Sequence, residues 1–182
     1  MCCGVISAMG RNIDRIVIAV GLSSMNILFV CSGNVSRSFM AEMLLRNEIE
    51  QLRLDNISIS SAGLFAYPGS PPDPKMVEHL LEMGISIKSH EAKQITEDDV
   101  DWADLILVME GDHATMIERL LPEAKGKVEL LGKFVSEGQN VVDDIPDPFG
   151  KSSYHYRLAQ TQITLAIRSF VKRVLLHQRG RL

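Results

Sequence analysis

Cys31 and Arg37 lie within the segment V-C-S-G-N-V-S-R-S, which separates an apolar strand-like run from a helix-like one. In a tight loop of this kind, successive backbone N–H groups can form a concave anion site, and the following helix adds the positive end of its dipole. Such a positive field favours the thiolate, which is the nucleophilic form of cysteine. The planar guanidinium of Arg37 matches two oxygens of a phosphoryl group. The segment therefore predicts a phosphate site that contains a sulfur nucleophile.

The other loop residues have types that suit this site. Gly33 would let the backbone approach an anion closely, and Asn34 tolerates a left-handed conformation in which its amide can brace the loop. Ser36 and Ser38 offer hydroxyl groups near the thiolate. A cysteine followed six positions later by arginine is a weak signal by itself, because a free cysteine is often a small buried apolar residue. The strand before the loop and the helix after it favour the catalytic interpretation.

A second candidate for chemistry is Asp147, in the segment D-D-I-P-D-P-F-G. A thiolate that attacks a phosphate ester must expel an oxygen leaving group, and this step benefits from a general acid nearby. Pro146 and Pro148 stiffen the backbone on both sides of the carboxyl group. The alternative is a plain surface turn, because Asp beside Pro is a common turn signal.

The composition of the 182 residues fits one globular domain, since 46% are hydrophobic and 23% are charged. A formal net charge of −4 argues against general nucleic-acid binding but allows a local positive pocket. The three cysteines, two of them adjacent at Cys2 and Cys3, provide no disulfide framework, which suggests a reducing, cytoplasmic setting. We expect no membrane span, and we expect a monomer. Residues 1–24 are expected to be a poorly ordered extension before a domain at 25–182.

The chain alternates short apolar runs with segments of helical periodicity. Strands are predicted at 26–30, 57–61, 105–109 and 128–131, and helices at 38–53, 73–83, 112–121 and 152–177. Strands that are apolar on both faces indicate an α/β fold, here a single-domain, three-layer fold with a four-stranded parallel sheet flanked by helices on both faces. The first strand-to-helix turn of such a sheet is a typical anion site, and the cysteine loop falls there.

From about Met25 onward, the sequence resembles the low-molecular-weight protein tyrosine phosphatase family. The cysteine loop and the downstream D-P-F-G carry the resemblance. Three further matching segments lie between them, in the order in which the family has them: S-S-A-G at 60–63, S-H-E-A-K-Q-I-T at 89–96 and D-L-I-L-V-M at 104–109. The resemblance implies that Cys31 forms a phosphocysteine, that Arg37 binds the phosphoryl group, and that Asp147 protonates the leaving group and then activates water. It implies neither a metal nor a cofactor.

The resemblance also implies a wider set of site residues. Substrate binding is expected at Ser32, Gly33, Asn34, Val35, Ser36, Ser38, Tyr67 and Phe149, and support of the loop at Ser61 and His90. Among these, Ser38 would bond the thiolate, and Tyr67 and Phe149 would be aromatic walls of the substrate cleft. The remaining histidines are expected to be surface or partly packed residues: His79, His113, His155 and His177.

Two departures from the family pattern stand inside the site. Ser36 replaces a second cysteine that can pair with the nucleophile in a protective disulfide, so this chain would lack that device. Phe39 replaces a usual proline, which is expected to loosen the loop or reshape the mouth of the cleft. Neither change removes a catalytic group.

Four functions are compatible with this reading. The leading one is a protein tyrosine phosphatase that acts on phosphorylated proteins. Its nearest rival is a protein arginine phosphatase, a branch that typically has Thr at the position of Val35; an apolar Val35 cannot polarise a water and so favours tyrosine. Thiol-based arsenate reduction would need further cysteines, and none follows Cys31. The last is a phosphate-loop binding module with little turnover.

Overall fold

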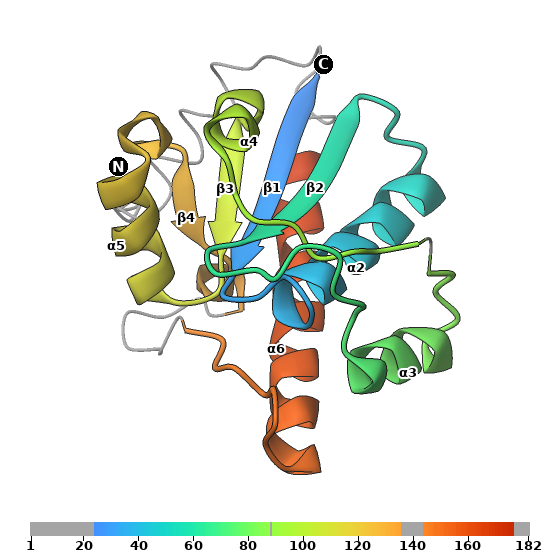
Figure 1. The fold of residues 1–182 in the computed structure, drawn as a ribbon. Helices are drawn as coiled ribbons and strands as arrows, with labels where there is room; N and C mark the ends of the chain where they lie inside the picture. Colours follow the sequence, from blue (N-terminus) through green and yellow to red (C-terminus); the bar gives the residue numbers. More distant parts are fainter. Residues whose placement is uncertain (1–23, 88, 136–143, 177–182) are drawn as a thin grey trace, which may run out of the picture.

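The computed structural model of the chain describes residues 24–87, 89–135 and 144–176 (Figure 1). Among these residues, four parallel strands form one sheet in the order β2-β1-β3-β4. The strands are β1 (Met25–Cys31), β2 (Ile57–Gly63), β3 (Leu105–Val108) and β4 (Val128–Leu130). The predicted fold class and all four predicted strands are confirmed. The expectation for residues 1–24 lies outside the described residues, except for Ser24.

The interior of the sheet consists of the two most apolar strands. β3 is buried at every position, and β1 is buried at all but Asn26. Phe29 of β1 pairs with Ser61 of β2 on one side and with Leu107 of β3 on the other. Because helices cover both faces of such a strand, continuous apolar runs rather than alternating ones specify these positions.

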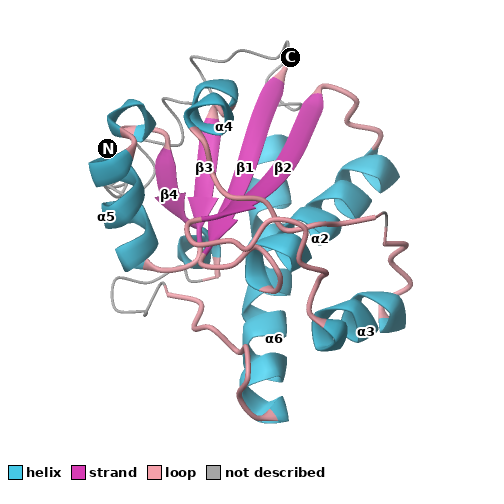
Figure 2. Cartoon of the chain, in the orientation of Figure 1, coloured by secondary structure: helices cyan, strands magenta, loops and turns pink. Residues whose placement is uncertain are grey.

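Helices cover both faces of the sheet, as Figure 2 shows. One face packs against α2 (Arg37–Leu52), α3 (Pro74–Glu82) and α6 (Ser153–Phe170) through a core that includes Ile27 and Phe29. The other face packs against α4 (Glu97–Trp102) and α5 (Gly111–Leu120) through a second core that includes Leu28 and Val30. Alternate residues of β1 thus point into different cores, and the three-layer arrangement is confirmed.

The helix ends follow local signals. Asp73 is the N-cap of α3, its side chain accepts a hydrogen bond from the N–H of Lys75, and Pro74 occupies the first helical position. α4 is short, and a capping box between Thr96 and Asp99 fixes its start. The predicted terminal helix at 152–177 divides into α6 and a π-helical turn, η3 (Val171–Leu176).

Two short 3₁₀ turns, η1 (Pro122–Ala124) and η2 (Leu131–Phe134), complete the elements of the described residues. None of the described helices is long and apolar enough to cross a membrane. The carboxyl ends of β1, β2 and β3 lie side by side, so the segments that follow them meet at one edge of the sheet (Figure 1). This is the edge at which an open α/β sheet binds ligands.

Candidate active site

The segment between β1 and α2 forms a tight loop around the sulfur of Cys31. Asn34 adopts a left-handed conformation, with φ of 57°, and Arg37 is the first residue of α2. The backbone N–H of Asn34 lies 3.3 Å from Cys31 Sγ, and the Ser38 hydroxyl lies 3.1 Å from it. Two donors therefore face the sulfur, and both can stabilise the negative charge that it carries as a nucleophile.

The fully buried Asn34 joins this loop to its neighbours. Its Nδ2 donates to the hydroxyls of Ser38, at 3.0 Å, and of Ser61, at 2.8 Å. Its Oδ1 accepts from the backbone N–H of Lys93, at 3.0 Å, and its carbonyl oxygen lies 2.8 Å from His90 Nε2. The structure thus brings Asn34, Ser61 and His90 together around the loop.

A buried carboxylate that the sequence analysis did not identify extends this network. Glu42 of α2 accepts from the Ser61 hydroxyl at 2.5 Å, and it pairs with Arg46 at 2.8 Å. Arg46 also donates to the carbonyl of Ile59 in β2. The spacing of Glu42 and Arg46 is that of an ordinary surface ion pair on a helix, so nothing in the sequence indicated that Glu42 turns inward.

Gly63, at the end of β2, touches the backbone of the loop. A Cβ atom at Gly63 would lie 2.8 Å from the carbonyl oxygen of Ser32 and 2.9 Å from the nitrogen of Asn34, so no larger residue fits without a backbone shift. Gly33 differs, because a Cβ there would meet only Val35 Cγ2, at an ordinary 3.8 Å. Gly63 therefore allows β2 to approach the loop closely, whereas Gly33 leaves space on the loop itself.

The guanidinium of Arg37 is 1% exposed and is held by several acceptors. Nη1 donates to Glu110 Oε2 at 2.6 Å and to the carbonyl of Ile145 at 2.9 Å. Nη2 lies 3.2 Å from Asp147 Oδ2 and 3.3 Å from the Ser32 hydroxyl. Nε is buried and has no hydrogen-bond partner among the described residues. Nη1 is thus committed to the protein, while Nη2 and Nε can together donate to two oxygens of a phosphoryl group.

The segment that carries Asp147 docks against the segment that follows β3. Asp144 Oδ1 accepts from the N–H of Gly111, the first residue of α5, at 2.8 Å. The N–H of Ile145 donates to the carbonyl of Met109 at 2.7 Å. Together with the contact between Arg37 and Ile145, these bonds place the Asp147 carboxylate beside the loop, so Asp147 is not part of a detached surface turn.

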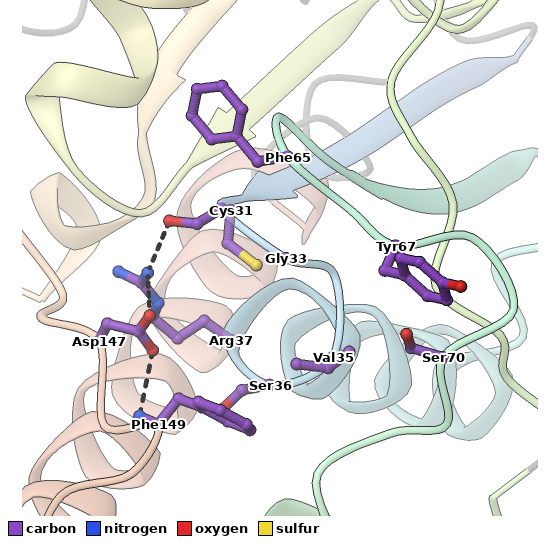
Figure 3. Close-up of a pocket in the computed structure, with 11 residues that line it drawn as sticks. Cys31, Gly33, Val35, Ser36, Arg37, Phe65, Tyr67, Ser70, Asp147 and Phe149 are labelled. Carbon is purple, nitrogen blue, oxygen red and sulfur yellow. Dashed lines mark hydrogen bonds and ion pairs between the residues drawn. The ribbon is translucent and has the colours of Figure 1, made fainter.

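Cys31, Arg37 and Asp147 line a pocket of about 270 Å³, which is shown in Figure 3. Aromatic side chains stand around it, and they are exposed: Tyr67 by 82%, Phe65 by 67% and Phe149 by 61%. Tyr67 and Phe149 therefore form a rim rather than the walls of a deep cleft. Phe65 and Ser70 also line the pocket, and neither was predicted from the sequence. The lining consists of Cys31, Ser32, Gly33, Val35, Ser36, Arg37, Phe65, Tyr67, Ser70, Asp147 and Phe149.

One expectation about the loop, that Phe39 reshapes the mouth of the cleft, is wrong. Phe39 does not reach the mouth of the cleft, because its side chain is fully buried and its ring packs against His90, with the ring centroids 4.6 Å apart. The hydroxyl of Ser36 is not among the donors to the sulfur; it is buried without a hydrogen-bond partner in the described part of the chain.

The expectation for His113 is also wrong. This residue, in the first turn of α5, is 6% exposed, with Nε2 lying 2.9 Å from the Ser32 hydroxyl and 3.5 Å from Glu110 Oε2. Burial, and then the charge of Arg37, lowers the pKa of His113 from its usual 6.5. Glu110 and His113 directly follow an apolar strand, and that position was the one sequence signal that could have placed them here. His177 lies outside the described residues.

The described residues contain no cluster of three or more His, Cys, Asp or Glu side chains that could hold a metal ion. The polar groups around the pocket are instead hydrogen-bond donors, together with one thiol and one carboxyl group. This arrangement suits a tetrahedral anion that is bound by N–H groups and attacked by sulfur.

Residues 26–179 match the model of the low molecular weight phosphotyrosine protein phosphatase family, and the chain belongs to that family. It is 39% identical over 141 residues to a protein-arginine-phosphatase of Geobacillus stearothermophilus, covering 78% of this chain and 90% of that one. It is 38% identical over 148 residues to the probable low molecular weight protein-tyrosine-phosphatase EpsP of Ralstonia solanacearum, covering 81% of this chain and 94% of EpsP.

A solved structure agrees with these sequence relationships. The YwlE arginine phosphatase from Geobacillus stearothermophilus superimposes with a TM-score of 0.76 at 35% identity, over 87% of this chain and 97% of that one. The chain is therefore a phosphatase of this family, with phosphorylated proteins as its class of substrate. The named relatives divide between those that act on phosphotyrosine and those that act on phosphoarginine.

Proposed function

We propose that this protein hydrolyses phosphotyrosine in proteins, through a phosphocysteine formed at Cys31. The observation that carries the proposal is the apolar lining above the phosphate loop. This lining consists of Val35 and the aromatic side chains of Phe65, Tyr67 and Phe149. A phenyl ring placed there would contact apolar and aromatic surface. Phosphoserine has no ring that could reach this rim.

In the first step, Cys31 Sγ attacks phosphorus while the bond between phosphorus and the tyrosine oxygen breaks. Nη2 and Nε of Arg37, with the N–H groups of the loop, bind the three non-reacting oxygens as the transition state forms. The Asp147 carboxyl group gives its proton to the departing oxygen, so that tyrosine leaves as a neutral phenol. The products of this step are dephosphorylated protein and phosphocysteine.

In the second step, the Asp147 carboxylate takes a proton from a water molecule, and the water oxygen attacks phosphorus. The bond between phosphorus and sulfur breaks, which returns the Cys31 thiolate and releases inorganic phosphate. Asp147 thereby recovers the proton that it gave in the first step. The same carboxyl group serves as acid and then as base, which requires that it stay on the open side of the loop.

The ion pair between Arg37 and Asp147 bears on substrate binding. A phosphoryl dianion would replace Asp147 Oδ2 as the partner of Arg37 Nη2, now 3.2 Å away. This exchange would leave the Asp147 carboxyl group free to face the leaving oxygen. Arg37 would keep its charge balanced, because Glu110 stays on Nη1 at 2.6 Å.

Phosphoarginine is the second candidate, and the identity of 39% to a protein-arginine-phosphatase favours it. Its leaving group is a cationic guanidinium whose N–H groups need hydrogen-bond acceptors. Beyond Asp147, the rim offers mainly apolar surface, and Val35 has no hydroxyl group that could orient a water for attack on the intermediate. These features favour tyrosine.

The deciding experiment compares kcat/KM for two peptides of identical sequence, one with phosphotyrosine and one with phosphoarginine, by release of phosphate. We expect a higher kcat/KM for phosphotyrosine, loss of turnover in Cys31→Ser, and a shift towards phosphoarginine in Val35→Thr. The matched control is Val77→Thr on α3, which does not line the pocket. A preference of the wild type for phosphoarginine would overturn the proposal, and turnover that survives Cys31→Ser would exclude the phosphocysteine route.

A further inference from the structure

We propose that His113 is a positioning residue that turns the hydroxyl proton of Ser32 into the pocket, where Ser32 donates a hydrogen bond to the phosphoryl group. The inference rests on the proposed function, since it assumes that the loop binds a phosphoryl group. The two reaction steps described above use neither side chain. The inference adds one neutral donor on the Arg37 side of the site.

Two contacts of the Ser32 hydroxyl oxygen restrict the direction in which its proton can point. A hydroxyl oxygen has two lone pairs and one proton. Ser32 lines the pocket, and its Oγ lies 3.3 Å from Arg37 Nη2, which can only donate. His113 Nε2 lies 2.9 Å from the same oxygen. If Nε2 also donates, both lone pairs are occupied, and the hydroxyl proton is left free to turn towards the pocket that Ser32 lines.

Two observations place the proton of His113 on Nε2. First, Nε2 lies 3.5 Å from Glu110 Oε2, an acceptor that attracts a proton at Nε2 and would repel a lone pair there. Second, Nδ1 is buried and has no hydrogen-bond partner in the described part of the chain. A proton on Nδ1 would therefore be a buried donor without an acceptor, which is more costly than an unfilled lone pair.

The imidazole of His113 is also uncharged at neutral pH, because its pKa is lowered from 6.5. Burial and the charge of Arg37 lower the pKa of His113, and they outweigh the nearby carboxylates of Glu110, Asp147 and Asp112. A neutral imidazole has one N–H group, so the choice of nitrogen decides the direction of the bond with Ser32. Glu110 makes that choice, and the Ser32 hydroxyl is left as a donor.

A double-mutant cycle tests this arrangement, with inorganic phosphate as a competitive inhibitor of p-nitrophenyl phosphate hydrolysis. We expect Ser32→Ala and His113→Phe each to raise the inhibition constant of phosphate about fivefold, the usual effect of one neutral hydrogen bond. We expect the double variant to be no worse than Ser32→Ala, because both changes remove the same bond. A His113→Phe variant with an unchanged inhibition constant, or a double variant with multiplied losses, would overturn the inference.

A second pair of variants covers the case in which His113→Phe does not fold. Gln can place an N–H group close to the position of Nε2, whereas Asn reaches only the position of Nδ1. We therefore expect His113→Gln to keep phosphate affinity and His113→Asn to lose it, although both retain a polar amide. Equal inhibition constants in the two variants would overturn the inference, because a merely structural role does not distinguish them.

The matched control is another serine–histidine pair. His155 Nδ1 lies 2.9 Å from the Ser152 hydroxyl at the start of α6, where both residues are exposed and neither lines the pocket. His155→Phe should leave the inhibition constant of phosphate unchanged. If wild-type protein hydrolyses phosphate esters through Cys31 but the cycle shows no coupling, the inference alone fails. If wild type neither binds phosphate nor turns over, the proposed function fails.

Discussion

Glu110 Oε2 lies 2.6 Å from Arg37 Nη1, and the guanidinium that it holds is 1% exposed. This contact joins the segment between β3 and α5 to the first residue of α2. A second carboxylate, that of Asp147, pairs with the other terminal nitrogen and lines the pocket, whereas Glu110 does not. Arg37 therefore has one permanent partner and one partner that a substrate can replace.

Replacing Glu110 by Gln should lower activity without changing the nucleophile. We expect kcat/KM for p-nitrophenyl phosphate to fall about tenfold or more, because a charge-assisted hydrogen bond to a buried group contributes about 1.5–3 kcal/mol. Steady-state kinetics give the measurement. The control is Glu129→Gln on β4, a buried carboxylate that pairs with Lys133 at 2.9 Å. An unchanged kcat/KM in Glu110→Gln would show that Arg37 needs no orienting carboxylate.

Replacing Asp147 by Asn should separate acid catalysis from phosphate binding. We expect kcat for a phosphotyrosine peptide to fall by about 10²–10⁴, the usual contribution of a general acid. The loss should be smaller for p-nitrophenyl phosphate, whose leaving group departs without a proton. The inhibition constant of inorganic phosphate should stay the same or decrease, since the ion pair to Arg37 Nη2 is removed. Equal losses of kcat for both substrates would argue against Asp147 as the acid.

A methyl group at Gly63 should disturb the phosphate loop from the neighbouring strand. A Cβ atom there would lie within 3.0 Å of the backbone of Ser32 and Asn34, so Gly63→Ala must displace the loop or β2. We expect a loss of about 1–3 kcal/mol in the free energy of unfolding, together with weaker phosphate binding. Urea denaturation and phosphate inhibition measure the two effects. Ser58→Ala, at an exposed position of the same strand, should change neither.

Tyr156→Phe should destabilise the fold through loss of the hydrogen bond to Asp73. The Tyr156 hydroxyl donates to Asp73 Oδ2 at 2.6 Å, and the Asp73 N–H in turn donates to the carbonyl of Val35 at 2.7 Å. We expect a loss of about 1–3 kcal/mol, because a buried carboxylate loses a donor. Thermal or urea denaturation gives the value. The control Tyr154→Phe, 63% exposed, should have little effect.

The same tyrosine makes stability depend on alkaline pH. Burial, followed by the hydrogen bond to Asp73, raises the pKa of Tyr156 to about 12 from its usual 10.0. Because the folded protein favours the protonated phenol, this stabilisation is complete below about pH 10 and is lost as the pH rises towards about 12. The difference in unfolding free energy between wild type and Tyr156→Phe should shrink over that range. A constant difference would contradict the shift.

Local patterns were sufficient to predict most of the architecture. Continuous apolar runs such as L-I-L-V predicted buried parallel strands, and the Cys31 loop between a strand and a helix predicted the anion site. The residues that the resemblance placed around the loop, such as Asn34 and Ser61, are also close together in the structure. The strands and the loop could be predicted because each is encoded by a short segment, and the order of the strands in the sheet then fixes which segments become neighbours.

The residues that sequence reasoning missed act through tertiary contacts. Glu110 and His113 meet Arg37 and Ser32 only because β3 lies beside β1 in the sheet. Glu42 turns inward because β2 presents the Ser61 hydroxyl to it. The buried position of Phe39 depends on the His90 ring against which it packs. No local pattern contains such information, because each partner is distant along the chain.

The proposed general acid, Asp147, lies late in the sequence, and this position has a consequence for protein synthesis. Among the described strands, Cys31 ends the first and Asp147 follows the last, and the core is closed by α6 only after that. A nascent chain that ends before Asp147 contains the nucleophile Cys31 but lacks the group that protonates the leaving oxygen. Translation therefore delivers the capacity to dephosphorylate only after residue 147 has left the ribosome.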